Sequence, residues 1–400
     1  MEDNNLEYMF SAEDRIEEAT TDELAERVCK ILVIGVGGGG NNAVNRMISS
    51  GIDSADFVSA NTDKQDLIQS IAPRKVVLGS SLTKGLGAGS NPVIGKKAAE
   101  ESKEVIKGLL EGVDLLFLTA GMGGGTGTGA APVIANIAHD LGILTIAVVT
   151  TPFKFEGNKR MSQAEAGINE LRQYVDTLVV VPNEKLLEVM PKGTKFREAF
   201  KYADDVLRQG IQGIADLIVK PCMINLDFAD VRTVLKEKGF AHIGIGIAEG
   251  ENRTVDAVRS AVNNKLLETN IGEATAAILN VTGGEDLELG EVEEAGSTVR
   301  SVLNPDATLI FGADVNDSLG KKVVVTIIAT GFKHVPNHVR PGYATRPSFS
   351  PLPKEPNPII ERPPIPERPI SAPRYAEEEQ GNRMRLSDAD LPPFMRKLKK

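Results

Sequence analysis

Short apolar runs alternate with amphipathic stretches between about residue 30 and residue 181. Apolar runs of this length, separated by helical patterns, are typical of buried strands. Six runs are expected to be strands: 31–34, 57–60, 76–78, 115–119, 145–149 and 177–181. Because strands linked by helices pair in parallel, this region predicts a parallel sheet with helices on both faces.

A long helical pattern follows the sixth expected strand. Apolar residues recur at i, i+3 and i+4 from Phe196 to Val219, and Pro221 ends the pattern. A helix of this length would span roughly 35 Å, enough to connect two domains. A second α/β domain is then expected from four further strands: 243–247, 276–281, 307–311 and 323–329.

Both ends of the chain differ in character from its middle. Residues 1–30 are rich in acidic side chains and predict a flexible extension. Twelve of the 22 prolines lie between Pro336 and Pro373, so a disordered linker is expected over 332–386. Residues 387–400 regain an amphipathic pattern, which favours a partner-binding peptide over a solvated charged tail.

The composition excludes several classes of protein. A net charge of −10 argues against a general nucleic-acid-binding protein. Cys29 and Cys222 have no CxxC or histidine nearby, which is typical of reduced cytosolic cysteines rather than of a metal site. No apolar run reaches the roughly 20 residues of a transmembrane helix, and the acidic start lacks the basic region of a secretory signal. We therefore expect a cytoplasmic protein.

The most informative segment is GMGGGTGTG at 121–129, between an apolar strand and a helical pattern. Glycines let the backbone approach a ligand closely, and N–H groups at a helix start attract negative charge. Thr126 and Thr128 would add hydroxyl donors. The alternative is a flexible linker, but linkers are not usually set between a core strand and a helix. The segment therefore predicts a phosphate site.

Two further glycine-rich segments follow other strands. Gly35, Gly37 and Gly40 satisfy the dinucleotide pattern GxGxxG, so a nucleotide-dependent oxidoreductase is a rival hypothesis. However, four consecutive glycines and two asparagines depart from that pattern. The acidic residue expected after the second strand is also displaced, in Asn61-Thr62-Asp63. With 85–92 as the third segment, the three are expected to converge on one crevice, at the carboxyl ends of the strands.

A Walker P-loop is absent from the sequence. Gly95-Lys96 comes nearest, but Lys97 stands where that motif requires serine or threonine. We therefore expect a triphosphate to be held mainly by backbone amides.

These segments together resemble the tubulin and FtsZ superfamily. GGGTGTG at 123–129 looks like its signature loop. Four other segments are similar to the FtsZ branch rather than to tubulin: NTD at 61–63, GLGAGSNP at 85–92, TPFKFEG at 151–157 and NLDFAD at 225–230. The resemblance covers about 30–331, and LPPFMRKLK near the end resembles the FtsZ tail peptide.

The resemblance implies an α/β fold with a Rossmann-like GTP-binding domain at 31–195 and a central helix at 196–220. It also implies a C-terminal activation domain at 221–331 and a tail peptide at 387–400. GTP or GDP is the implied ligand, with Mg²⁺ bridging its phosphates and no metal-ligating side chain assigned. The implied nucleotide-binding residues are Gly38, Gly39, Asn42, Asn61, Gly123, Gly124, Gly125, Thr126, Gly127, Thr128, Glu156, Arg160, Asn183, Phe200 and Asp204.

Some of these residues have distinct implied roles. Glu156 and Arg160 would meet ribose and phosphate, and Phe200 would stack on the base. Asn183 and Asp204 would hydrogen-bond the base; a carboxylate can accept both N1–H and the N2 amino group of guanine. Without the resemblance, Phe200 and Asp204 would be interpreted as a core aromatic and a solvated charge.

The resemblance places catalysis on Asn225, Asp227 and Asp230, which follow the central helix. They should lie far from the nucleotide of their own subunit, so the resemblance implies that they act on the nucleotide of the adjacent subunit. Asp227 and Asp230 would then orient water toward the γ-phosphate. The alternative is that Asp227 merely caps a helix at 229–236.

The implied function is a polymerising GTPase that forms head-to-tail filaments in the cell-division ring at mid-cell. Its tail would bind membrane-tethering adaptors and division regulators, so that membrane association is indirect and no nucleic acid is bound. A scaffold that binds GTP without hydrolysing it is the second rival hypothesis.

Overall fold

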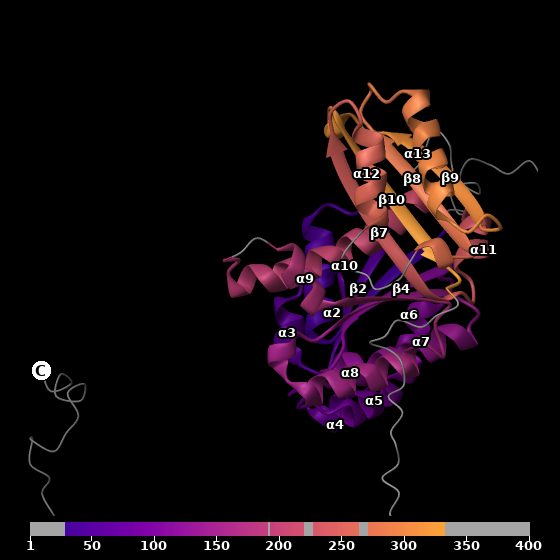
Figure 1. The fold of residues 1–400 in the computed structure, drawn as a ribbon. Coiled ribbons are helices and arrows are strands. Elements are labelled where there is room, and N and C mark those ends of the chain that lie inside the picture. The colour runs from indigo at the N-terminus through magenta and orange to yellow at the C-terminus, as the bar shows by residue number, and fades with distance from the viewer. Residues whose placement is uncertain (1–28, 191–192, 220–226, 264–270, 333–400) are drawn as a thin grey trace, which may run out of the picture. The chain divides into compact units, whose positions relative to one another are not determined.

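The computed structural model describes residues 29–190, 193–219, 227–263 and 271–332 (Figure 1). The acidic extension up to residue 28, Asn225, the proline-rich linker from residue 333 and the tail peptide fall outside these residues. All described residues belong to one unit of the chain. Among them, no helix is both long enough and apolar enough to cross a bilayer.

The first six strands form a parallel sheet in the order β3-β2-β1-β4-β5-β6. This confirms the predicted parallel sheet and each of the six expected strands. The strand order reverses between β1 and β4, which is where open parallel sheets bind ligands. The strands are β1 Ile31–Val36, β2 Asp56–Asn61, β3 Arg74–Val77, β4 Leu115–Gly121, β5 Leu144–Thr151 and β6 Thr177–Pro182.

The sheet continues into the second half of the chain. Thr177 and Leu178 of β6 pair with Gly239 and Phe240 of β7, so that ten strands are joined. Beyond β7 the order is β10-β8-β9, with β10 antiparallel to both neighbours. The four strands are β7 Gly239–Glu249, β8 Ala276–Gly283, β9 Thr308–Val315 and β10 Lys322–Thr330.

Helices connect the strands, and α10 has the bounds that its sequence pattern predicts. The α-helices are α2 Gly37–Ser49, α3 Lys64–Gln69, α4 Ser80–Thr83, α5 Pro92–Glu101, α6 Lys103–Leu110, α7 Thr126–Asp140, α8 Asn158–Leu171, α9 Asn183–Val189, α10 Phe196–Val219, α11 Phe228–Leu235, α12 Arg253–Val262 and α13 Leu289–Val302. Three short 3₁₀ helices are η1 Lys154–Glu156, η2 Ile271–Glu273 and η3 Asp317–Leu319.

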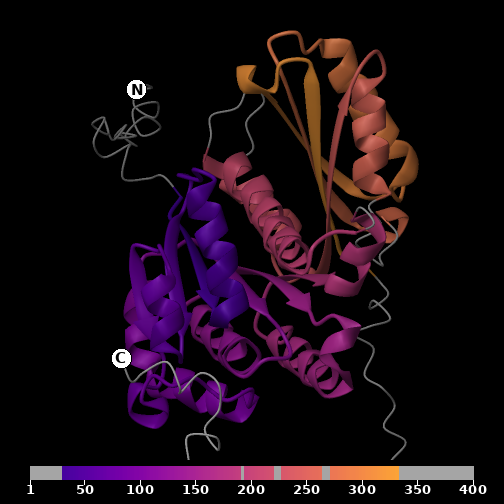
Figure 2. The same cartoon turned by 90° about the vertical axis from the view of Figure 1, so that its left-hand side faces the viewer.

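Alternate residues of β1 enter two different cores, as the period of a strand requires. Ile31 and Val33 pack in a core that includes residues of α2 and α10. Leu32 and Ile34 pack on the other face, with residues of α5, α6, α7 and α8. Figure 1 shows these four helices together on one side of the strands, and Figure 2 shows α10 beside α2.

Helix α10 is shared between the two halves of the sheet. Its residues Leu207 and Ile211 are buried in the same core as Ile243 of β7 and Ile328 of β10. A third core lies between α12, α13 and the strands β8 and β10. The second half of the chain therefore has its own apolar core and a separate contact with α10.

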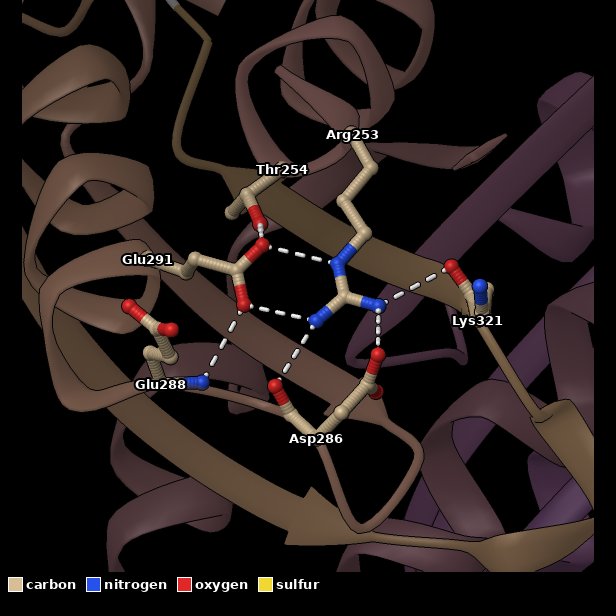
Figure 3. Close-up of polar contacts among 6 residues, drawn as sticks. All are labelled: Arg253, Thr254, Asp286, Glu288, Glu291 and Lys321. Atoms are coloured by element: carbon tan, nitrogen blue, oxygen red, sulfur yellow. Dashed lines mark hydrogen bonds and ion pairs between the residues drawn. The ribbon is translucent and has the colours of Figure 1, made fainter. Parts of the chain in front are cut away.

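A buried guanidinium joins four segments at one end of this second core (Figure 3). Arg253, at the start of α12, makes a bidentate ion pair with Glu291 of α13, each N–O distance being 2.8 Å. Its remaining hydrogen bonds go to Asp286 Oδ2, to Asp286 O and to Lys321 O, at 2.9–3.0 Å. All five N–H donors of the guanidinium are used. These hydrogen bonds lower the pKa of Glu291 to about 2.

Replacing Arg253 by Met should destabilise the fold, because Glu291 would keep its charge without the cation that compensates it. We expect the free energy of unfolding to fall by roughly 3 kcal/mol in urea titrations. The Glu291 contribution is present above about pH 4.5 and is lost as the pH falls toward 2 in the native protein. Adding Glu291→Gln to Arg253→Met should recover part of the loss. Equal stability of Arg253→Met and the native chain from pH 2 to pH 7 would contradict this assignment.

Candidate functional site

A cavity of about 540 Å³ opens at the carboxyl ends of the strands around the place where the strand order reverses, between β1 and β4. We call it the glycine-loop cavity, because the three glycine-rich segments of the sequence meet there. Its wall is completed by Asn183 at the start of α9 and by residues of α10. The predicted convergence of the three segments is therefore found. Of the predicted binding residues, these line it: Gly38, Gly39, Asn42, Asn61, Gly124, Gly125, Thr126, Gly127, Glu156, Arg160, Asn183, Phe200 and Asp204.

The β1–α2 and β4–α7 loops touch each other across the cavity floor. A Cβ atom on Gly37, whose φ is +71°, would lie 2.9 Å from Gly127 N. A Cβ atom on Gly39 would lie 3.2 Å from the Cα atom of Gly121. Side chains here would push the two loops apart. Glycine is thus required for the two loops to meet.

The helices that follow these loops begin without side-chain caps. Neither α2 nor α7 has a side-chain hydrogen bond at its N-cap or an acidic residue in its first turn, within the described chain. The first N–H groups of a helix have no intrahelical partner and carry partial positive charge. Two such helix starts face one cavity, which makes it an anion site.

Gly123 and Thr128 lie behind the cavity wall rather than in it. Thr128 is buried, and its Oγ1 accepts a hydrogen bond from Gly123 N at 2.8 Å. A Cβ atom on Gly123 would lie 2.6 Å from Pro152 Cγ. This pair holds the loop in shape. Thr126 does reach the cavity, where its Oγ1 lies 2.6 Å from Thr62 Oγ1.

Asn61 is held by protein groups on every side. Its Nδ2 donates to Asp66 Oδ2 at 3.0 Å, and its Oδ1 accepts from Asp63 N at 3.3 Å. Asn41, with its amide oriented so that both atoms are satisfied, donates to Gly35 O at 2.8 Å and accepts from Asn61. The chain of amides thus links Asp66 to the carbonyl of Gly35 at the end of β1. Asn41 and Asp66 were not predicted from the sequence, although Asp66 lies one turn after Asp63.

The third glycine segment is fastened to the end of β2. Gly87 N donates to Thr62 O at 3.1 Å, and Lys64 N donates to Gly85 O at 3.1 Å. Asn91 then caps α5, accepting from Val93 N at 3.0 Å. These bonds fix the loop as a wall of the cavity, with Leu86 82% exposed at its mouth.

Polar and aromatic groups line the opposite wall. Asn183 is buried, and its Oδ1 has no hydrogen-bond partner among the described residues. Burial raises the pKa of Asp204 to about 6, a shift that Arg46 opposes and Asp205 increases. Phe200 meets Phe153 edge to face, with ring centroids 5.3 Å apart. On this wall, a buried acceptor and a half-buried carboxylate that forms no ion pair with the described residues call for a ligand with several N–H donors.

Glu156 and Arg160 form an ion pair at the edge of the cavity. Glu156 Oε1 also accepts from Phe153 N at 2.9 Å. A carboxylate has about four acceptor positions, so Glu156 keeps capacity for a ligand hydroxyl. Arg160 is half exposed and can turn toward an anion.

Asp227 and Asp230 are exposed at the start of α11 and do not line the glycine-loop cavity. Asp227 Oδ1 accepts from Asp230 N at 2.7 Å, so Asp227 caps the helix, which begins at Phe228. The capping alternative is thus confirmed for Asp227, and it does not exclude a second role. Among the described residues, no three acidic, histidine or cysteine side chains are grouped as a metal site.

Comparisons with known proteins agree with this geometry. The model of the Tubulin/FtsZ family, GTPase domain, matches residues 30–191, and that of the FtsZ family, C-terminal domain, matches 239–333. An empty dimer of FtsZ from M. jannaschii is 47% identical, covers 78% of this chain and 90% of its own, and superposes with a TM-score of 0.74. A single-residue mutant of M. jannaschii FtsZ is 46% identical over 80% of this chain and 96% of its own, with a TM-score of 0.75.

A more distant structure shares the fold. CetZ2 from Haloferax volcanii, solved as a GTPγS-bound protofilament, is 21% identical. It covers 78% of this chain and 95% of its own, with a TM-score of 0.68. The predicted fold class is confirmed.

Two glycines of the 121–129 segment should respond differently to alanine. A Cβ atom on Gly129 would lie 2.0 Å from Pro92 O, whereas one on Gly124 would meet nothing within 4 Å. We expect Gly129→Ala to lower the free energy of unfolding by about 2 kcal/mol or more through overpacking. Gly124→Ala should change stability by less than about 0.5 kcal/mol. Its methyl group should instead weaken binding of a phosphate-bearing ligand, measured by calorimetry. The reverse pattern would show that Gly124 does not face the ligand.

Proposed function

Because the chain belongs to the FtsZ family of tubulin-like GTPases, we propose that it binds GTP in the glycine-loop cavity. It hydrolyses the GTP where successive subunits of a head-to-tail filament meet. One observation carries the proposal: two uncapped helix starts face a cavity whose far wall bears Asn183 and Asp204. The phosphates bind to the two helix starts, and guanine binds to Asn183 and Asp204.

The phosphates are held by backbone N–H groups. Gly38 and Gly39 supply N–H groups in the first turn of α2, and Gly124 to Thr126 supply those at the start of α7, while Asn42 adds its side-chain amide one turn further along α2. Lysines are absent from the cavity wall among the described residues. Dipoles fixed by helices need no reorganisation when the ligand arrives, which favours a triphosphate.

Guanine is recognised by Asp204 and Asn183. The Asp204 carboxylate accepts N1–H and the N2 amino group, which adenine does not offer in that arrangement. The buried Asn183 Oδ1 gains a donor from the base, and Phe200 stacks on it. Glu156 accepts from ribose, while Arg160 pairs with phosphate oxygens.

Mg²⁺ would enter this site together with the nucleotide, whose phosphates would supply ligands to it. The cavity wall carries the carboxylates of Asp63 and Asp66, but the described residues contain no cluster of three metal-ligating side chains. The ion would neutralise charge on the phosphates. The protein positions the nucleotide, and the metal takes most of its ligands from phosphate and water.

Hydrolysis needs groups that the cavity of one subunit lacks. Asn183 follows the last residue of β6 and lines the cavity, whereas Thr177, the first residue of β6, contacts the last residue of α11. A strand of this length separates its ends by roughly 17 Å. No residue of α11 lines the cavity of its own subunit, and the last residue of this helix lies about one strand length from Asn183, which supports a second subunit as the recipient of Asp227, Asp230 and Asn225. Their role is to orient water toward the γ-phosphate, so catalysis is mainly positioning.

A head-to-tail contact at the cavity mouth would bury apolar side chains. Ile68 of α3, Leu86 and Phe155 are 78%, 82% and 63% exposed, and each lies within two residues of a cavity-lining residue or is one itself. Apolar side chains around a polar cavity are typical of an interaction surface. A contact between two different surfaces of the same chain does not close, so it yields a filament.

The remaining parts of the chain complete the proposal. Residues 31–195 form the GTP-binding domain, 196–220 the central helix and 221–331 the activation domain that acts on the next subunit. The acidic extension at 1–30 and the linker at 332–386 flank them. Residues 387–400 recruit membrane-tethering adaptors and division regulators. The filament assembles in the cytoplasm as the division ring at mid-cell.

GTPase activity per subunit should rise with protein concentration and then reach a plateau, since two subunits build each site. Phosphate release and sedimentation measured on the same samples test this. Asp230→Ala should lower turnover by about 100-fold or more while leaving monomer GTP affinity unchanged. Asp256→Ala, at an exposed carboxylate on α12, is the control and should retain turnover.

Specific activity that stays flat with concentration would contradict the shared site. Filaments that form with GTP but release no phosphate would favour the non-hydrolysing scaffold.

Asp204→Asn should change the base that is recognised. An amide offers one acceptor and one donor, which suits xanthine but opposes the N2 amino group of guanine. We expect GTP affinity to fall by roughly 10- to 100-fold and XTP affinity to rise. In the native protein GTP affinity should fall as the pH drops through about 6, because Asp204 then binds a proton.

The pH dependence and the change of base separate this role from a structural one. Asp205→Asn is the matched control for the choice of base, because Asp205 pairs with Arg208 and does not line the cavity. Unchanged preference for GTP in Asp204→Asn would remove Asp204 from the base site.

A further inference from the structure

Helix α11 has its last carbonyl groups satisfied by neighbours outside the helix. The final four carbonyls of an α-helix lack intrahelical partners. In α11, Arg232 O accepts from Lys236 N at 2.8 Å. Val234 O accepts from Thr330 Oγ1 at 2.8 Å, and Leu235 O accepts from Thr177 Oγ1 at 2.5 Å. Both threonines are 0% exposed.

The two hydroxyl groups come from distant parts of the sheet. Thr177 is the first residue of β6, within the match to the GTPase domain, and Thr330 is the last residue of β10, within the match to the C-terminal domain. The segment after α11 is also fastened to the start of β6. Lys238 N and Gly239 N both donate to Asp176 O at 2.9 Å. The C-terminal end of α11 thus has fixed points on two strands.

The other end of α11 carries the functional carboxylates. Val231, Val234 and Leu235 are fully buried and fix the depth of the helix, while Asp227 and Asp230 are exposed. A helix of eight residues is roughly 12 Å long, so a tilt of roughly 5° about its C-terminal end moves its first turn by roughly 1 Å. Apolar contacts are not directional, whereas two hydrogen bonds to successive carbonyls oppose such a tilt.

We propose that Thr177 and Thr330 are positioning residues for hydrolysis. Their hydroxyl groups set the angle at which α11 presents Asp227 and Asp230 to the nucleotide of the next subunit. This inference rests on the proposed function, in which those carboxylates complete the neighbour's active site. Neither threonine lines the glycine-loop cavity.

The test replaces each threonine by valine, which keeps the shape and the strand preference but removes the hydroxyl. Thr330→Val and Thr177→Val should lower kcat by roughly 10-fold or more, since small displacements of reacting groups are costly. GTP affinity of the monomer and the assembled fraction should stay unchanged. Thr330→Ser and Thr177→Ser, which retain the hydroxyl, should restore most of the turnover.

The matched control is Thr145→Val. Thr145 is a buried residue of β5 whose Oγ1 donates to Ile143 O at 3.0 Å rather than to α11. Its backbone hydrogen bonds with Asp176 are kept in the valine variant. The Thr145→Val variant measures the cost of removing a buried hydroxyl group from the same sheet. Its kcat should stay at the native value. An equal fall of kcat in Thr145→Val, or native kcat in both Thr177→Val and Thr330→Val, would overturn the proposal.

A mixing experiment locates the defect in one half of the shared site. Thr330→Val is mixed with an excess of Asp204→Asn, whose pockets are filled with XTP, and GTP turnover per Thr330→Val subunit is measured. Native α11 helices now face the GTP-bearing pockets, so turnover should rise several-fold. A defect confined to the pocket of the variant would not be rescued, and that result would contradict the proposal.

A reference mixture separates this inference from the proposed function. Asp230→Ala mixed with Asp204→Asn should also regain GTP turnover. If the reference mixture stays inactive while the proteins co-sediment, the shared active site itself is wrong. If the reference regains turnover and both threonine variants do not, only the positioning role is wrong.

Discussion

The site depends on one steric constraint: two helix starts, those of α2 and α7, must face the same cavity at close quarters. Their loops can meet only because Gly37 and Gly39 carry no side chain where Gly127 and Gly121 approach. The first N–H groups of both helices have no intrahelical partner, and in our proposal they together replace the lysine of a P-loop. The cavity, its preference for anions and the placing of the base wall on α9 and α10 all follow from this approach.

The strands separate the two functions of the chain. The residues that we propose to bind nucleotide line a cavity at the carboxyl ends of the parallel strands, while α11 is attached at the amino end of β6 through Thr177. One subunit therefore offers a pocket at one end and carboxylates at the other, which suits a head-to-tail filament. The second half of the chain, stabilised by its own core and by Arg253, holds α11 through Thr330. Assembly and hydrolysis are in this way linked by the direction of the sheet.

Sequence patterns were sufficient for the strands, for α10 from Phe196 to Val219 and for the convergence of three loops, because these depend on local periodicity and on strand direction. The resemblance was needed for Phe200 and Asp204, which look like ordinary helix residues. Neither source gave the amide chain through Asn41, the pairing of β6 with β7 or the threonine hydroxyl groups that bond to the end of α11. These are contacts between residues distant in sequence, and they leave no local period. The GxGxxG pattern was misleading as a sign of a dinucleotide site, because its glycines have a packing role. A Cβ atom on Gly35 would lie 2.4 Å from Gly40 O, so these glycines allow close packing of α2 on β1.

The central claim is that one chain holds the phosphates with helix N–H groups and the next chain supplies the carboxylates. A high-resolution cryo-electron microscopy structure of filaments with a slowly hydrolysed GTP analogue tests it most directly. We predict phosphate oxygens within hydrogen-bond distance of N–H groups in the first turns of α2 and α7. The carboxylates nearest the γ-phosphate on its open side should be Asp227 and Asp230 of the adjacent subunit. Phosphates bound mainly by side-chain cations, or an adjacent α11 turned away from the γ-phosphate, would contradict the account.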